Sequence, residues 1–244
     1  MSGFPLFFQK PVVLSSEVHR NFKFRAESNY KFALKANSIP LTLAEFERAA
    51  ACYPIVFTKS DNPVPVVVTG LTAQQNVFVE PDGSWANGKY VPAYVRKFPF
   101  LFLESSDGDQ FTLCVEEANL VENIGSPLFE DGKPTSLVSS ALDFCKNYHA
   151  AWQQTVEQCV LLKEHGLLID RRADIQTADG EKFSLDGFNV IDREKFYELT
   201  DDVMLKLPRS LVGAINSHFV SMSSWQNLLS RIVKSDDPAR KKRK

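Results

Sequence analysis

Two side chains in the second half of the chain have the chemistry of a nucleophile and a base. Cys145 and His149 stand four residues apart in a segment that predicts a helix, so they share one helix face. Such a pair could act as nucleophile and general base, or bind one metal ion. No third ligand or orienting carboxylate is evident, because Asp143 falls on another side of the helix. A partly buried helix face without chemistry also explains the pair, and we prefer that interpretation.

The densest group of side chains that could bind a ligand lies between residues 85 and 102. Aromatic faces pack on sugars or other rings, and an arginine fork can bind a carboxylate through two hydrogen bonds. Four residues form the candidate binding site: Trp85, Tyr90, Tyr94 and Arg96. The alternative is packing, in which Pro92 begins a short helical turn, Pro99 ends it, and the rings wedge the turn against a sheet. We expect packing to account for most of the aromatic residues.

The remaining histidines and cysteines have structural explanations. His218 lies on the apolar face of the last predicted helix, which favours a core or interface position. His165 precedes Gly166 at a predicted helix end, where a positive charge interacts well with the helix dipole. The four cysteines are widely spaced and form no C-x-x-C pair, which favours buried, reduced thiols. Phosphate-binding, dinucleotide-binding and zinc-protease motifs are absent from the sequence, so we expect no cofactor and no metal.

Charge is unevenly distributed along the chain. The net charge of −2 becomes −7 once the five basic residues 240–244 are removed. An acidic body argues against a nucleic-acid groove, because phosphate binding needs a basic surface. The tail itself is either a solvated end or an arm for an anionic surface, and we prefer the former. The sequence shows no signal peptide and no run of about 20 apolar residues, so we expect a cytoplasmic protein without a membrane span. Export to the surface would need a route without a classical signal peptide.

These candidates must be positioned by two differently built parts. In residues 1–125, short apolar or alternating runs predict strands, and Thr42 and Glu45 form a capping box for a helix that ends near Cys52. The predicted strands are 22–24, 30–34, 55–57, 64–69, 76–79, 100–103 and 111–115. Asp107-Gly108 indicates a hairpin turn between the last two.

The part from 126 to 235 is predicted to be mainly helical. An apolar stripe runs from Ser136 to His165 and predicts one long helix. Asp179-Gly180 indicates a tight hairpin between strands 173–177 and 181–185, and 187–191 is predicted as a third strand. Helices are expected at 193–199 and 201–206, followed by one last helix after Pro208.

The predicted fold class is therefore α+β. We expect an antiparallel, hairpin-rich N-terminal sheet, and a helical C-terminal half with one long helix and a small hairpin. Residues 236–244 form a basic tail. The division near residue 125 could separate two domains, or the long helix could pack on the N-terminal sheet and make one continuous domain.

Three segments, in their order and spacing, resemble the bacterial SapC family. They are Tyr90–Phe102, Gly125–Thr135 and Asp179–Asp192. The resemblance extends over nearly the whole chain. It implies a role around surface-layer, nutrient-uptake or halogenase-type systems, because members are often encoded beside halogenase-like flavoproteins, cupin-like proteins and TonB-dependent receptors. It supplies no catalytic residue.

The sequence and the resemblance together suggest an accessory or binding protein. We expect it to act with a protein partner, such as a halogenase-like or cupin-like neighbour, or with a small ligand, and to have no catalysis of its own. Two alternatives stay open. One is an enzyme with a site near Trp85–Arg96 or at Cys145 and His149, and the other is a structural component of a surface layer.

Overall fold

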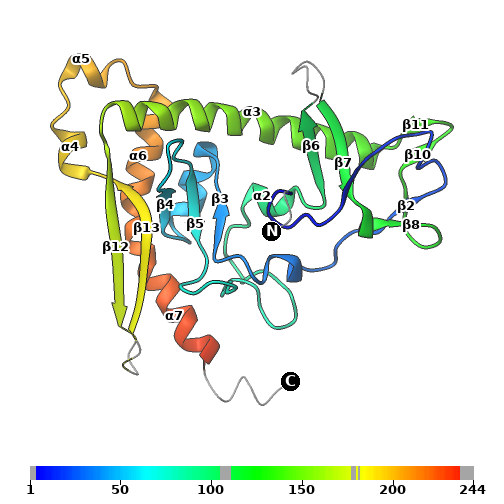
Figure 1. Ribbon diagram of the computed structural model, residues 1–244, viewed down its shortest axis with the longest axis horizontal. Coiled ribbons are helices and arrows are strands. Elements are labelled where there is room, and N and C mark those ends of the chain that lie inside the picture. Colours follow the sequence, from blue (N-terminus) through cyan, green and yellow to red (C-terminus); the bar gives the residue numbers. More distant parts are fainter. Residues whose placement is uncertain (1–3, 105–110, 177–179, 181, 237–244) are drawn as a thin grey trace.

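Helices and antiparallel strands share the fold, which confirms the α+β prediction (Figure 1). In this computed structural model, residues 4–104, 111–176, 180 and 182–236 are described. The predicted turn at Asp107-Gly108, residue Asp179 and almost all of the basic tail lie outside these residues.

The largest sheet has five strands in the order β12-β13-β4-β5-β3. Their bounds are Ser38–Pro40 (β3), Ile55–Thr58 (β4), Pro65–Val68 (β5), Leu168–Gln176 (β12) and Lys182–Ile191 (β13). β13 joins β4 by pairing Phe188 with Thr58 and Asn189 with Phe57. The C-terminal hairpin therefore extends the sheet built by the N-terminal part.

The other strands form three smaller sheets, whose strand orders are β1-β7-β6, β8-β2-β9 and β10-β11. Their strands are Pro11–Val13 (β1), Lys23–Phe24 (β2), Phe100–Glu104 (β6), Phe111–Glu116 (β7), Leu120–Val121 (β8), Ser126–Pro127 (β9), Phe129–Glu130 (β10) and Lys133–Pro134 (β11). The predicted strands 100–103 and 111–115 thus form the β6–β7 hairpin.

Helices fill most of the C-terminal half. The α-helices are Phe46–Ala50 (α1), Ala93–Arg96 (α2), Ser136–Glu164 (α3), Arg193–Tyr197 (α4), Asp201–Met204 (α5), Arg209–Ser221 (α6) and Trp225–Asp236 (α7). Short 3-10 turns occupy Lys31–Ala33 (η1), Leu43–Glu45 (η2), Glu117–Asn119 (η3) and Met222–Ser224 (η4). None of the described helices is long and apolar enough to cross a membrane.

The long helix α3 passes along both halves of the molecule, from the small sheets to the five-stranded sheet (Figure 1). Near its start, Val138 and Cys145 belong to a hydrophobic cluster with β6 and β7. Near its end, Cys159 and Leu162 belong to the main core around the five-stranded sheet. One helix therefore contributes to two hydrophobic clusters.

Local end signals were predicted well. The Thr42–Glu45 capping box forms, although the helix begins as η2 before α1. Asp192 accepts a hydrogen bond from the Lys195 amide at the start of α4. Gly166 follows α3 with φ of +60°, a left-handed conformation that suits glycine.

Four element predictions were wrong. Segment 30–34 is not a strand, because Asn29 Oδ1 accepts from the Lys31 amide and starts the turn η1. Segment 187–191 is not a third strand of its own but the second part of β13. β13 continues past Gly187, which has φ of +77°, because the pairing with β12 shifts register between Arg171 and Ala173. The last helix is broken by η4, where the serine hydroxyls bond to backbone carbonyls. Segment 76–79 also forms no strand, and only Val79 makes a bridge, to Trp85.

Candidate functional site

The candidate binding residues lie on and before the short helix α2, which packs under α3. Pro92 precedes the first turn, and its carbonyl accepts from the amides of Val95 and Arg96. Pro99 follows the helix and leads into β6. This is the short helical turn bracketed by prolines that the sequence predicts. Because successive residues of a helix point in different directions, Tyr94, Arg96 and Lys97 meet different surroundings.

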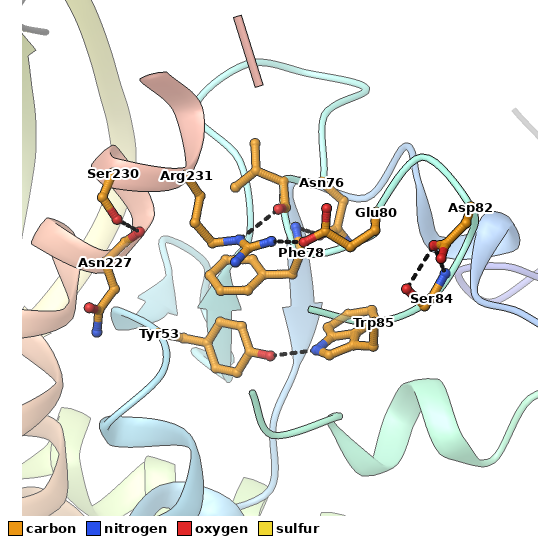
Figure 2. A network of polar contacts seen from close by, with 11 residues as sticks. Tyr53, Asn76, Phe78, Glu80, Asp82, Ser84, Trp85, Asn227, Ser230 and Arg231 are labelled. Atoms are coloured by element: carbon orange, nitrogen blue, oxygen red, sulfur yellow. Dashed lines mark hydrogen bonds and ion pairs between the residues drawn. The ribbon is translucent and has the colours of Figure 1, made fainter. Parts of the chain in front are cut away.

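Trp85 is part of the core. Its side chain is 8% exposed, and its indole Nε1 donates to the Tyr53 hydroxyl at 2.8 Å (Figure 2). The Tyr53 hydroxyl in turn donates to the backbone carbonyl of Tyr90. A buried indole N–H with a partner of this kind is satisfied within the fold. Trp85 therefore supports the segment that carries the site, and it lines neither of the two cavities found beside α2.

The loop that holds Trp85 is fastened by the last helix. Arg231 of α7 donates from Nε to the Val77 carbonyl at 2.8 Å, and its Nη2 lies 2.5 Å from Glu80 Oε1. Its guanidinium also lies over the Phe78 ring, with 5.1 Å between Cζ and the ring centroid (Figure 2). The C-terminal helix thereby fixes the loop before α2.

Tyr90 connects a buried carboxylate to Arg96. Its hydroxyl donates to Glu45 Oε1 at 3.0 Å and accepts from Arg96 Nη2 at 3.1 Å. Glu45 is 6% exposed and also accepts from the Ala93 amide at 2.6 Å and from Thr42. Burial, with the neighbouring Glu45 charge, raises the pKa of Tyr90, so its hydroxyl stays protonated as the donor to Glu45.

Arg96 is the member of the predicted site that meets solvent. Its Nε donates to the Val91 carbonyl at 3.1 Å, and its guanidinium lies over two rings, 5.3 Å from the Phe144 centroid and 5.7 Å from that of Tyr90. Among the described residues, no carboxylate forms an ion pair with it. Arg96 is therefore a positioned cation with hydrogen-bond donors left for another group.

Tyr94 points to the other side of α2. Its hydroxyl donates to the Leu6 carbonyl at 3.3 Å, and its ring packs near those of Phe7 and Tyr148. Burial raises its pKa to about 12. Tyr94 thus anchors the N-terminal segment to α2 and α3, as the packing alternative predicts.

Lys97 was not among the predicted site residues, yet it is buried, unlike the other Lys and Arg residues whose burial the structure describes. It is only 9% exposed, and its Nζ lies 4.3 Å from the ring centroid of Tyr94, 5.2 Å from that of Phe8 and 5.4 Å from that of Tyr148. Burial lowers its pKa to about 8. The sequence gives no signal for this, because a lysine at the end of a four-residue helix normally reaches solvent.

A cavity of about 320 Å³ opens beside α2 and α3. Its wall is mainly aromatic and aliphatic, with Arg96, Lys97 and Glu27 as the charged residues. The other lining residues are Phe24, Ala26, Phe98, Pro99, Phe100, Ser140, Ala141, Phe144 and Cys145. A neighbouring cavity of about 240 Å³ shares Glu27, Arg96 and Phe98 with it. Arg96 therefore borders both hollows.

Cys145 and His149 occupy one side of α3, as their spacing predicts, and Cys145 lines the larger cavity. Burial raises the pKa of the Cys145 thiol to about 11, although the Lys97 charge opposes this shift. The thiol is therefore protonated at neutral pH, which weakens it as a nucleophile. Within the described residues, no group of three or more His, Cys, Asp or Glu side chains is arranged to hold a metal ion.

His218 and His165 lie where the sequence places them. His218 is fully buried in α6, its Nε2 accepts from the Ile191 amide at 3.1 Å, and burial lowers its pKa to about 4. His165 caps the C-terminal end of α3. Both have structural roles, and neither approaches the cavity beside α2.

The comparisons with known proteins agree with the resemblance seen in the sequence. The family model described as SapC matches residues 14–228, most of the chain. No curated protein and no solved structure matches. The match contains all of the Tyr90–Phe102, Gly125–Thr135 and Asp179–Asp192 segments. This chain therefore belongs to the SapC family.

Proposed function

We propose that this protein is a non-catalytic binding protein that takes a small carboxylate with a flat apolar body into the cavity beside α2. The observation that carries the proposal is Arg96. Its guanidinium is held in place by Tyr90, Val91 and Phe144, borders the cavity, and has no acidic partner among the described residues. A planar guanidinium in a fixed position favours bidentate recognition of a carboxylate.

The cavity wall supports the apolar part of this ligand class. Phe24, Phe98, Phe100 and Phe144 offer ring surfaces, and the volume of about 320 Å³ is at the small end of ligand pockets. Glu27 is the acid in the wall, and its carboxylate accepts a hydrogen bond from Asn119 Nδ2 at 3.0 Å. This bond directs Glu27 toward the η3 segment. Glu27 keeps its negative charge, but the two cations of the wall, Arg96 and Lys97, outnumber it.

An accessory role beside a partner protein is part of the proposal. The family resemblance implies halogenase-like or cupin-like neighbours, and a binding protein could deliver or retain their small acidic compounds. The protonated Cys145 thiol favours binding over catalysis. A cytoplasmic location is supported by the four cysteines, which are all buried and free, as is usual in a reducing compartment.

Calorimetric titration with benzoate tests the binding site. We expect wild-type protein to bind benzoate, and Arg96→Met to bind it at least about ten-fold more weakly, because a charge-assisted bidentate contact is lost. Arg20→Met, at an exposed position outside the cavity, is the matched control and should bind like wild type. Benzyl alcohol, of similar size but uncharged, should bind far more weakly than benzoate. Equal benzoate affinity of wild type and Arg96→Met, or no binding at all, contradicts the proposal.

A further inference from the structure

Lys97 is a buried amine without a counter-ion. Three rings surround its Nζ, and in the described part of the chain no carboxylate and no hydrogen-bond acceptor meets it. Buried lysines are rare and are normally paired with an acid. The usual structural explanation, an internal salt bridge, therefore does not apply to Lys97.

The groups around Lys97 stay uncharged at neutral pH. Cys145 and Tyr148 face it from α3, and Tyr94 faces it from α2, while the N-terminal segment contributes the Phe8 ring. Burial raises the pKa of all three titratable groups. Glu45 influences Tyr148, but its oxygens are occupied by Thr42, Tyr90 and Ala93. Glu27 lines the same cavity as Lys97, and its carboxylate accepts from Asn119.

In this environment, an appreciable fraction of the Lys97 side chains carries an unprotonated amine at neutral pH. With a pKa of about 8, about a quarter of the Lys97 amines are unprotonated at pH 7.5, compared with about one in a thousand for an ordinary exposed lysine. The three rings attract the ammonium and oppose this shift, since cation–π contacts favour the charged form. The same rings would stabilise a protonated imine, which carries the same positive charge.

Lys97 also lines the cavity of about 320 Å³, together with Cys145 and Phe144. We propose that Lys97 is a covalent capture site that binds small aldehydes as imines. The neutral amine attacks the carbonyl carbon, a C–N bond forms, and a proton moves from nitrogen to oxygen to give a carbinolamine. A proton from solvent then converts the hydroxyl into water, which leaves as the C–O bond breaks; the nitrogen lone pair forms the C=N bond, and the protonated imine remains. Desolvated lysines in apolar sites are suited to this reaction.

Reductive trapping with benzaldehyde and cyanoborohydride tests the proposal on the wild-type protein at pH 7.5. Peptide mass mapping then compares benzylation of Lys97 with that of Lys146. Lys146 is an exposed lysine on α3, the helix that packs over Lys97. We expect Lys97 to react at least about ten-fold faster, because far more of it is neutral. Labelling of Lys97 at or below the rate of Lys146 overturns the proposal. The comparison is made within the wild-type protein, so it needs no variant that could misfold.

Variants and pH add a second readout. Lys97→Arg keeps the charge but cannot form an imine, so it should lose the fast adduct while Lys146 is labelled as before. The preference for Lys97 should decrease above pH 8, since Lys97 is then already neutral and ordinary lysines are still losing protons. A preference that does not change with pH contradicts the assigned role. Aldehyde capture does not depend on Arg96, so labelling without benzoate binding sustains this inference and refutes only the proposed function.

Discussion

At the residue scale, Glu45 connects the binding site to the core. One carboxylate accepts hydrogen bonds from Thr42, Tyr90 and the Ala93 amide, and so joins η2 to the start of α2. Arg96 depends on this arrangement, because the Tyr90 hydroxyl that holds it is itself held by Glu45. The capping box made the role of Glu45 at a helix start recognisable in the sequence. Its other hydrogen-bond donors, the Tyr90 hydroxyl and the Ala93 amide, are more than 40 positions away.

Replacement of Glu45 should therefore affect both stability and binding. We expect Glu45→Gln to lower the free energy of unfolding by about 3 kcal/mol, because buried donors would face an amide nitrogen. Urea denaturation measures this loss, and Glu47→Gln, on the exposed side of α1, serves as the control with little change. Benzoate affinity should fall in Glu45→Gln as well. Unchanged stability would show that the amide is accommodated and that Glu45 does not organise the site.

His218 should make the protein sensitive to acid. Its pKa is about 4 in the fold, below the ordinary value of 6.5, so the unfolded chain binds a proton that the folded chain excludes. The free energy of unfolding should consequently fall as pH decreases from about 6.5 to about 4, by about 3 kcal/mol in total. Urea denaturation at several pH values measures the slope. His218→Gln should flatten it; identical slopes in wild type and His218→Gln would assign the acid sensitivity to other groups.

At the element scale, α7 holds the loop before α2 through Arg231. The contact is partly buried and combines a backbone hydrogen bond, the Glu80 ion pair and the Phe78 ring. We expect Arg231→Met to cost about 2 kcal/mol in urea denaturation, and Arg209→Met, at an exposed position in α6, to cost little. A double-mutant cycle with Glu80→Gln should give a coupling energy above about 0.5 kcal/mol. Additive losses would mean that the ion pair with Glu80 adds nothing to the backbone and ring contacts of Arg231.

The sequence predicted elements where the deciding interactions are local. The apolar stripe predicted a helix from Ser136 to His165, and α3 covers Ser136–Glu164; prolines placed the turn of α2. Some predictions failed because a distant contact decides: η4 breaks the last helix as Ser224 donates to the Ala50 carbonyl, 174 residues away. The strand predicted at 30–34 failed over a local hydrogen bond that the apolar pattern does not encode, from the Lys31 amide to Asn29 Oδ1. The candidate site also contains one residue with a local signal and one that depends on distant contacts. Arg96 was predicted from its own chemistry, whereas Lys97 is unusual only because distant rings surround it.

At the scale of the whole molecule, α3 links the two hydrophobic clusters, and unfolding should therefore be cooperative across both. The tryptophan fluorescence reports mainly on the main core, which contains Trp85. Val138→Ala, in the other cluster, should still lower the urea midpoint of the fluorescence transition, at a cost of about 2 kcal/mol. Circular dichroism should give the same midpoint, since one transition is expected. Val160→Ala, on the exposed face of α3, is the control with a small effect. If Val138→Ala shifts only an early circular dichroism step and leaves fluorescence unchanged, the two clusters unfold separately and α3 does not couple them.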